Sequence, residues 1–327
     1  LRHRVKYNNQ NDDFMTVDKF LSTYRIYLPK ADLIVLDECS TIENLKMKEV
    51  LKRVGNSLLV LTGDIYQIES IGFGNWFSLL KDFLPEYCIT ELQTTYRSTN
   101  DNLKELWKEV RNLDDNENEA LEDLIRCSYS SEINTSIFDN IDDKEDEIIL
   151  CLNYNGLYGL NNINKLLQLS KNGKKADIGI WQFRVGDRIL FTDSGRFSIL
   201  YNNLKGKIID IEDQTSSVKF TIEINIKLEK DEVNACDGLT YISSTNNKTT
   251  VCFNVDRHKP YYFDYEPENK KHVLPFQVAY AVSIHKSQGL EFSSVKIVVS
   301  NESENKITHD IFYTAITRAQ NHLKIYW

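Results

Sequence analysis

The chain has 327 residues and a formal net charge of −9, with 41% hydrophobic and 27% charged residues. This length is too great for one modest core, so two or three domains are expected, and no apolar run approaches the ~20 residues that a membrane-spanning helix needs. Six scattered cysteines without a CxxC pair argue against a zinc site or a disulfide framework, and they favour a reducing cytoplasm.

The acidity of the chain is local. Between Arg111 and Glu147 there are 13 acidic and 3 basic residues, a net charge of −10, so the rest of the chain sums to about +1. A basic channel elsewhere in the molecule is compatible with this distribution. Charge therefore neither supports nor excludes a nucleic-acid partner.

The first elements in chain order form a strand–helix–strand pattern. Residues 33–36 and 58–61 are short all-apolar runs, and a helix is predicted between them over about 41–54. Such runs are typical of parallel strands buried on both faces of an α/β sheet. The predicted helix has its apolar stripe at Met47, Val50, Leu51 and Val54.

A second α/β segment and a β-rich segment follow. A helix is predicted after Thr99, with Leu103, Leu106, Trp107 and Val110 on one face, and a strand over 147–152 precedes a helix over 161–169. From residue 183 to about 263 the pattern changes to short alternating strands over 188–192, 205–211, 219–226 and 250–255. These strands predict a small inserted β barrel. The α/β pattern then resumes with strands over 277–284, 294–299 and 323–327.

Carboxylates follow both of the first two apolar runs. Asp37 and Glu38 come directly after the first run, at the strand end where α/β sheets bind ligands. Asp37 there is suited to hold a Mg²⁺ that bridges phosphates, and Glu38 is suited to polarise an attacking water. The alternative is that both acids only open the following helix. The second run leads into LTGDIYQ, where Gly63 permits a tight turn and Gln67 is suited to sense a phosphate or water.

Three further segments carry charged residues in a fixed order: TTYRS, SIHKSQGLEF and YTAITRA. Arg97 in the first and Arg318 in the last are candidates to stabilise charge on a transferring phosphoryl group. A surface salt bridge is the alternative for either arginine taken alone. Five such segments in this order favour the catalytic interpretation.

These residues resemble superfamily-one helicases, and specifically the 5'-to-3' branch that includes the RecD-like enzymes. LDECS is similar to motif II (Walker B), LTGDIYQIES to motif III and TTYRS to motif IV, while SIHKSQGLEF is similar to motif V and YTAITRA to motif VI. The resemblance covers nearly the whole chain. One departure is Cys39, where the family more often has Ala or Ser.

The resemblance implies roles for individual residues. In the catalytic group that it implies, Asp37 ligates Mg²⁺, Glu38 is the base, and two arginine fingers, Arg97 and Arg318, act from opposite sides of the cleft. The members of this group are Asp37, Glu38, Gln67, Arg97 and Arg318. It implies contacts with the nucleotide ATP from Gly63, Asp64, Gly289 and Glu291. It implies contacts with DNA, or coupling of DNA to the nucleotide, from Thr62, Ser283, His285, Lys286 and Thr314. The aromatic residues after motif III are open to two readings, stacking on bases or core packing: Tyr66, Phe73 and Trp76.

The implied fold is α/β, with two RecA-like parallel-sheet domains of the P-loop NTPase type. The first domain is incomplete, and an SH3-like β barrel is inserted in the second. The implied organisation is a first domain over 1–110, an acidic linker and helix over 111–146, the start of the second domain over 147–180, the barrel over 181–272 and the rest of the second domain over 273–327.

The sequence contains no G-x-x-x-x-G-K-[ST] phosphate-binding loop. The pair Gly173–Lys174 is followed by Lys175 rather than Ser or Thr, and Leu1 lies only 36 residues before Asp37. Either the gene lacks this loop or the chain starts after it, and we expect the second because the residues that act on a triphosphate are in place. Weak or absent ATP hydrolysis is therefore expected of this chain alone.

The expected function is an ATP-dependent DNA helicase or translocase acting on single-stranded or duplex DNA, with Mg²⁺ as cofactor. Protein partners in a repair or defence complex are compatible with the resemblance, and no membrane is expected. The alternative from another class is a catalytically dead helicase-like module that binds DNA or a protein. An RNA helicase is not separable by sequence, because phosphate contacts do not reveal the sugar.

Overall fold

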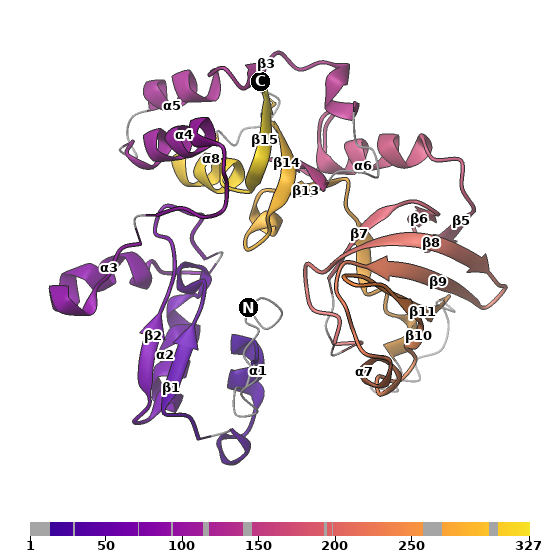
Figure 1. Ribbon diagram of the computed structural model, residues 1–327, viewed down its shortest axis with the longest axis horizontal. Helices are drawn as coiled ribbons and strands as arrows, with labels where there is room; N and C mark the ends of the chain where they lie inside the picture. The colour runs from indigo at the N-terminus through magenta and orange to yellow at the C-terminus, as the bar shows by residue number, and fades with distance from the viewer. Residues whose placement is uncertain are drawn as a thin grey trace. The chain divides into compact units, whose positions relative to one another are not determined.

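A computed structural model describes residues 14–327, apart from 29, 71, 93, 114–117, 140–145, 193–194, 198, 258–269 and 301–306. The chain forms two compact units (Figure 1). The first comprises Leu1–Tyr96 with His309–Thr314, and the second comprises Arg97–Thr308 with Ala315–Trp327. The boundary expected at residue 110 therefore falls inside the second unit.

The first unit is built on two parallel strands, β1 (Leu33–Leu36) and β2 (Leu58–Leu61). The chain passes from one to the other through η2 (Cys39–Thr41) and α2 (Asn44–Val54), which confirms the predicted strand–helix–strand order. The remaining elements of this unit, besides the start of α8, are α1 (Val17–Ser22), η1 (Arg25–Tyr27), α3 (Trp76–Phe83) and η3 (Glu86–Cys88).

Only one face of this two-stranded sheet packs on a core. Leu36, Leu59 and Leu61 lie against a cluster that includes Met47 and Val50 of α2. The opposite face is exposed at Leu33 (51%), Val35 (50%), Leu58 (66%) and Val60 (39%). The expectation of burial on both faces is wrong for this sheet, because successive side chains point to opposite faces and α2 covers one of them. The predicted stripe of α2 is likewise wrong at Leu51, which is exposed.

The second unit contains a five-stranded parallel sheet. Its order is β13 (Ala281–Ser283), β4 (Glu147–Cys151), β14 (Phe292–Val298), β15 (Ala319–Tyr326) and β3 (Ser130–Ser131). All residues of β4 are buried, so this strand is covered on both faces. The helices and 3₁₀ turns that accompany this sheet along the chain are α4 (Asp101–Arg111), α5 (Asn118–Ile125), η4 (Thr135–Phe138), α6 (Leu160–Leu169), η6 (His285–Ser287) and α8 (His309–Ile316).

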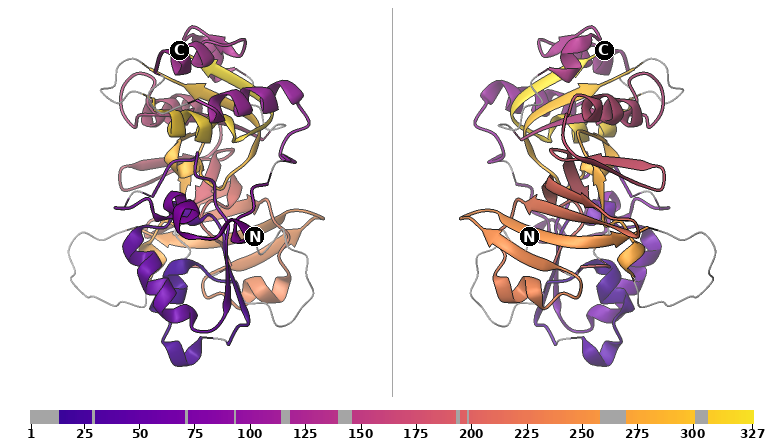
Figure 2. Two further views of the ribbon diagram at one scale, coloured as in Figure 1. Left: turned by 90° about the vertical axis from the view of Figure 1, so that its left-hand side faces the viewer. Right: turned by 90° about the vertical axis from the view of Figure 1, so that its right-hand side faces the viewer.

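An antiparallel sheet of six strands is inserted in the chain between α6 and β13. Its order is β10 (Thr240–Ser244), β11 (Thr249–Asp256), β9 (Ser217–Ile224), β8 (Lys205–Asp213), β7 (Arg188–Phe191) and β12 (Phe276–Val278). A hairpin of β5 (Lys175–Ile178) and β6 (Trp181–Arg184) precedes it, and α7 (Lys230–Asn234) lies beside β10 (Figure 2). The 3₁₀ turn η5 (Lys270–His272) comes before β12.

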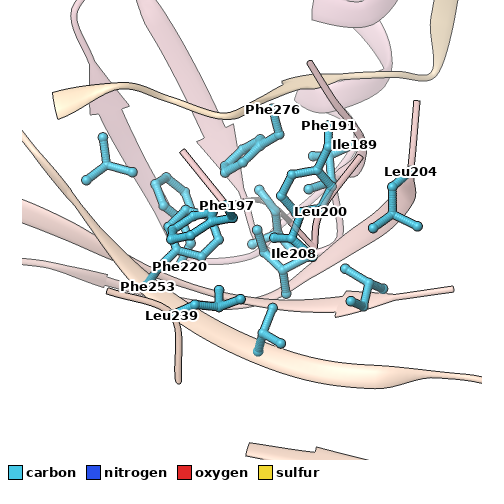
Figure 3. Packing of buried hydrophobic residues seen from close by; sticks show 14 of the residues in the cluster. Ile189, Phe191, Phe197, Leu200, Leu204, Ile208, Phe220, Leu239, Phe253 and Phe276 are labelled. Carbon is cyan, nitrogen blue, oxygen red and sulfur yellow. The ribbon is translucent and has the colours of Figure 1, made fainter. Parts of the chain in front are cut away.

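The six-stranded sheet has its own aromatic core. The rings of Phe220, Phe253 and Phe276 lie within 5.1–6.4 Å of one another, centroid to centroid, and Phe197 lies 5.0 Å from Phe253 (Figure 3). The edge-to-face contacts of Phe276 with Phe220 and Phe253 add to the burial of apolar area. The inserted segment therefore has a hydrophobic core distinct from that of the parallel sheet.

The strand predicted over residues 277–284 is two strands. β12 belongs to the antiparallel sheet and β13 to the parallel sheet, and only Ala279 and Tyr280 separate them. The amide of Ala279 donates to Arg188 O (2.8 Å), and that of Tyr280 donates to Asn164 Oδ1 (3.0 Å) on α6. The apolar pattern runs through both strands without interruption, so it does not reveal the change of sheet.

A buried polar group joins the two sheets at this point. The carboxylate of Asp187 accepts hydrogen bonds from Gln168 Nε2 (2.7 Å) on α6, from Arg184 N (2.8 Å) and from Tyr280 Oη (3.0 Å). Asp187 has no exposed surface, and burial raises the pKa of its carboxyl group. The donors come from both sides of the junction, so Asp187 fixes the inserted sheet to the parallel sheet.

Among the helices that the structure describes, none is long and apolar enough to cross a membrane.

Candidate functional site

The carboxyl ends of β1 and β2 bring two of the predicted residues together. The hydroxyl of Thr62 donates to Asp37 Oδ1 at 2.6 Å. The ladder continues beyond the strands, since Thr62 N donates to Leu36 O (2.9 Å) and Cys39 N donates to Thr62 O (2.8 Å). Asp37 is exposed, and it lies at the strand end where α/β sheets bind ligands.

The next residue, Glu38, has a backbone conformation that is uncommon for a side-chain-bearing residue. Its φ of 56° and ψ of 41° are left-handed. The Thr41 hydroxyl donates to Glu38 O (2.7 Å), and Cys39 beside it is buried with its Sγ donating to Leu36 O (3.1 Å). The surrounding contacts hold this turn, which places Asp37 and Glu38 in a sharp change of chain direction.

The segment after β2 is organised around Asp64. Its carboxylate accepts hydrogen bonds from Tyr66 N (3.1 Å) and from Gln67 Nε2 (3.1 Å), and Gln67 is buried. A Cβ on Gly63 would lie 2.7 Å from the Phe77 ring, so only glycine fits this turn. Asp64 therefore acts in this structure as the acceptor that fixes the Gln67 side chain.

Thr314 is joined to the same segment within the first unit. Its hydroxyl accepts a hydrogen bond from Ile68 N at 2.9 Å, and the residue has no exposed surface. The rings of Tyr66 and Tyr313 lie 6.1 Å apart, edge to face. Of the two roles foreseen for Thr314, contact with DNA or coupling, the buried hydroxyl favours coupling.

The aromatic residues after motif III fall into two groups. Trp76 packs against the core of the first unit, and its Nε1 donates to Ile42 O (2.6 Å). Phe73 is exposed and available to stack on a ligand.

The two arginines converge on one short segment of the second unit. Arg97 Nε donates to Glu291 Oε1 (3.1 Å), and its Nη1 donates to Thr317 O (2.9 Å). Arg318, only 1% exposed, donates through Nη1 to Leu290 O (3.2 Å). A carboxylate and two carbonyl groups thus hold both guanidinium groups next to residues 290–291.

The expectation that these arginines lie on opposite sides of a cleft differs from the structure, in which both belong to the second unit. The segment from Arg97 into α4 packs on that unit. The Ser98 hydroxyl donates to Gln320 O, and Trp107 Nε1 donates to Ile316 O (3.0 Å). These contacts carry Arg97 into the second unit.

Motif V residues expected to face DNA are unequally accessible. Ser283 is buried, and its hydroxyl accepts a hydrogen bond from Lys286 N (3.3 Å). Lys286 is partly buried, its Nζ donates to Gln277 Oε1 (2.7 Å), and burial lowers its pKa. His285 is exposed. Gly289 has a φ of +72°, a left-handed conformation that favours glycine.

One residue near the arginines was not predicted. Gln320 Nε2 donates to Glu291 Oε2 (3.0 Å), so the Glu291 carboxylate is bound on both oxygens. The only signal in the sequence is that Gln320 follows the TRA segment directly.

Two family models match parts of the chain: a UvrD-like helicase C-terminal domain over residues 278–326 and an AAA domain over residues 8–131. The RecBCD enzyme subunit RecD of Buchnera aphidicola subsp. Schizaphis graminum is 25% identical over 183 residues, which is 54% of this chain and 24% of that protein. The same subunit from Buchnera aphidicola subsp. Acyrthosiphon pisum is 22% identical over 178 residues, also 54% of this chain and 24% of that protein. The chain thus spans about a quarter of the length of these relatives.

Solved structures of Pif1 helicases share the fold. The Candida albicans Pif1 helicase matches with a TM-score of 0.54 at 15% identity, over 90% of this chain and 71% of that one. Bacteroides Pif1 bound to single-stranded DNA matches with a TM-score of 0.53 at 16% identity, over 98% and 75%.

The family models and the relatives confirm the resemblance to superfamily-one helicases that the motifs predict. Within that superfamily, the RecD relatives support the RecD-like branch.

Proposed function

We propose that this chain carries the ATP-dependent motor of a DNA helicase or translocase that moves 5'-to-3' along single-stranded DNA. The observation that carries the proposal is the convergence of Arg97 and Arg318 on the segment that contains Glu291. Arginines that stabilise a transferring phosphoryl group must be positioned together and held until the ligand arrives. An ordinary surface ion pair does not require two arginines from distant motifs at one short segment.

In this proposal Asp37 and Glu38 act on the nucleotide in the first unit. Glu38 takes the proton of the attacking water. Gln67, whose side chain is held by its hydrogen bond to Asp64, contacts the γ-phosphate. Gly63, Asp64, Gly289 and Glu291 shape the nucleotide site, and Arg97 and Arg318 act as arginine fingers. Ser40 Oγ, in the middle of η2, is buried without a hydrogen-bond partner among the described residues.

The Asp37 carboxylate fits a Mg²⁺ that arrives with ATP. Mg²⁺ prefers oxygen ligands and is usually bound by one or two carboxylates together with substrate phosphates. When bound, the ion neutralises charge on the β- and γ-phosphates. The Thr62 hydroxyl fixes the orientation of Asp37 for this task.

The DNA strand is proposed to be held mainly through its phosphates. The residues proposed for this side of the motor, by contact or by coupling to the nucleotide, are Thr62, Ser283, His285, Lys286 and Thr314. We further propose that the six-stranded sheet is the SH3-like barrel of the RecD-like branch, inserted in the second of two RecA-like domains. Binding of DNA through its phosphates is sensitive to salt and tolerant of base sequence. A cytoplasmic location and partners in a repair or defence complex belong to the same proposal.

The test uses the complete gene product and measures ATP hydrolysis with and without oligo-dT. We expect DNA-stimulated hydrolysis, which falls by a factor of about a thousand or more in Arg97→Ala or Arg318→Ala. Glu38→Gln should also lower hydrolysis, because it removes the proposed base. Glu43→Gln, a change of an acid near the start of α2, is its matched control. The present 327 residues alone are expected to hydrolyse ATP weakly or not at all, because the sequence contains no phosphate-binding loop. DNA binding without any hydrolysis by the complete product would instead establish the catalytically dead binding module.

A further inference from the structure

Lys205, the first residue of β8, reaches from the six-stranded sheet to the segment between η6 and β14. Its Nζ donates to Glu291 O (2.6 Å) and to Asp146 Oδ2 (2.6 Å), and it lies 3.9 Å from the centroid of the Phe292 ring. A carbonyl, a carboxylate and an aromatic face therefore hold one ammonium group. Its side chain is 23% exposed, so these contacts are only partly weakened by solvent.

The segment that Lys205 contacts is the one that positions both arginines. The Glu291 carboxylate binds Arg97, and Leu290 O accepts a hydrogen bond from Arg318. Phe292 N donates to Arg318 O (2.9 Å), which ties the segment to β15. A displacement of residues 290–292 therefore changes the surroundings of both guanidinium groups.

Other hydrogen bonds also cross this junction, and one of them joins β12 to η6, where Lys286 Nζ donates to Gln277 Oε1 (2.7 Å). Arg188 Nη1 donates to Glu147 O (2.7 Å) at the start of β4, and Asp187 bonds to Gln168 on α6 and to Tyr280. These contacts fasten the six-stranded sheet to the scaffold of the parallel sheet. Lys205, by contrast, contacts the main chain of the residue whose side chain holds Arg97.

We infer that Lys205 is a positioning residue that couples the six-stranded sheet, which contacts the proposed DNA-binding residue Lys286 through Gln277, to Arg97 and Arg318, so that DNA and nucleotide influence each other's binding. The inference rests on the proposed function. A change in the position of the sheet moves the Lys205 ammonium, and with it Glu291 O and the Phe292 ring. Because coupling between sites is reciprocal, DNA then alters the affinity for nucleotide by the same factor as nucleotide alters the affinity for DNA.

The experiment measures the Kd of the complete gene product for fluorescent oligo-dT, with and without a saturating non-hydrolysable ATP analogue and Mg²⁺. The ratio of the two Kd values is the coupling factor, which we expect to be about five or more in the natural protein. In Lys205→Met the factor falls toward one, because the ammonium is lost while the aliphatic stem remains. Lys205→Arg keeps most of the factor, since a guanidinium also bonds to carbonyl and carboxylate groups and stacks on rings.

Lys219→Met is the matched control. Lys219 lies on β9 of the same sheet and pairs with Glu212 (2.9 Å), and no described contact joins it to residues 290–292. The coupling factor of the Lys219→Met variant should equal that of the natural protein. If Lys205→Met does not fold, Asp146→Asn removes one anchor of the ammonium from an exposed position and should lower the factor partially.

The outcomes separate the inference from the proposed function. A natural protein that binds neither ATP analogue nor DNA contradicts the proposed function. A natural protein that binds both without coupling, or a folded Lys205→Met variant that retains the full factor, overturns the role of Lys205 and leaves the proposed function standing.

Discussion

At the scale of single residues, burial separates the cysteines into reactive and unreactive thiols. All six are free in the structure. Burial raises the pKa of Cys39 to about 11 and that of Cys151 to about 12, whereas Cys88 is exposed. The thiolate is the nucleophile, so a raised pKa and a lack of access both slow alkylation.

We therefore predict that iodoacetamide at pH 8 modifies Cys88 in the folded protein while Cys39 and Cys151 stay unmodified until the protein is unfolded in urea. Mass spectrometry of peptides after timed quenching measures the order. Cys88→Ser removes the fast phase and serves as the control. Modification of Cys39 as fast as that of Cys88 would show that the turn after β1 opens readily in solution.

Asp187 gives the junction between the two sheets a dependence on pH. Burial raises the pKa of its carboxyl group above the ordinary 3.8. At pH values between the ordinary pKa and the raised pKa of the folded protein, the folded protein binds more protons than the unfolded chain. The contribution of Asp187 to the free energy of unfolding is therefore complete at low pH and declines as pH rises through the folded pKa.

Urea unfolding from pH 4 to pH 7 compares the stability of the natural protein with that of Asp187→Asn. Asparagine presents an NH₂ group to hydrogen-bond donors, so we expect a loss of about 1–3 kcal/mol. The difference in free energy of unfolding between the natural protein and Asp187→Asn should be largest at pH 4 and shrink toward pH 7. Asp177→Asn, at an exposed position on β5, is the control for the same chemical change outside the junction. A difference that grows with pH would mean that the fold favours the charged carboxylate.

At the scale of elements, the β1–β2 sheet is unusual because it is parallel and yet open on one face. Parallel sheets are normally covered on both faces. The exposed side chains of Leu33, Val35 and Leu58 lie on the face opposite α2. The stability of the first unit should therefore depend on only one face of its sheet.

We predict that Val35→Thr on the open face changes the free energy of unfolding by less than about 0.5 kcal/mol. Leu59→Ala on the packed face should cost about 2 kcal/mol, because it removes apolar contacts with the core. Denaturant unfolding followed by circular dichroism measures both. An equal cost for the two variants would show that the open face is covered in solution, and repeating the measurement on dilution would reveal whether a second copy covers it.

The elements that sequence periodicity predicts well are those with a strong local pattern. Both apolar runs of the first unit form strands, and the stripe of α4 is buried as predicted at Leu103, Leu106, Trp107 and Val110. Local pattern fails where tertiary pairing decides. β10 carries little apolar alternation, and the alternation of β5 and β6 extends over only four residues in each strand. The division of residues 277–284 between two sheets leaves no mark in their hydrophobicity.

The candidate site shows the same limit. Motif order predicts Arg97 and Glu291 as site residues, but these residues are 194 positions apart, and no local rule predicts their ion pair. The burial of Ser283 and Thr314 is also set by packing that the motifs do not encode. Lys205 belongs to no motif, and its contact with Glu291 depends on how the inserted sheet meets β14.

At the scale of the whole molecule, the acidic charge is concentrated in one segment. Residues 111–147 carry a net charge of −10, and the rest of the chain sums to about +1. Glu119, Glu122 and Asp123 of α5 are exposed. Exposed charges act on an approaching polyanion over about 10 Å at 0.1 M salt, so this helix should repel DNA at low ionic strength.

Neutralising these three acids, as Glu119→Gln, Glu122→Gln and Asp123→Asn together, should therefore raise the association rate with oligo-dT about two- to tenfold at 20 mM salt. The gain should vanish near 0.5 M salt, where the Debye length is only a few ångströms. Stopped-flow fluorescence at several salt concentrations measures both limits in one series, and unchanged dissociation rates would show that the helix acts on the encounter and not on the bound state. An equal gain at all salt concentrations would contradict long-range repulsion and point instead to a direct contact between α5 and DNA.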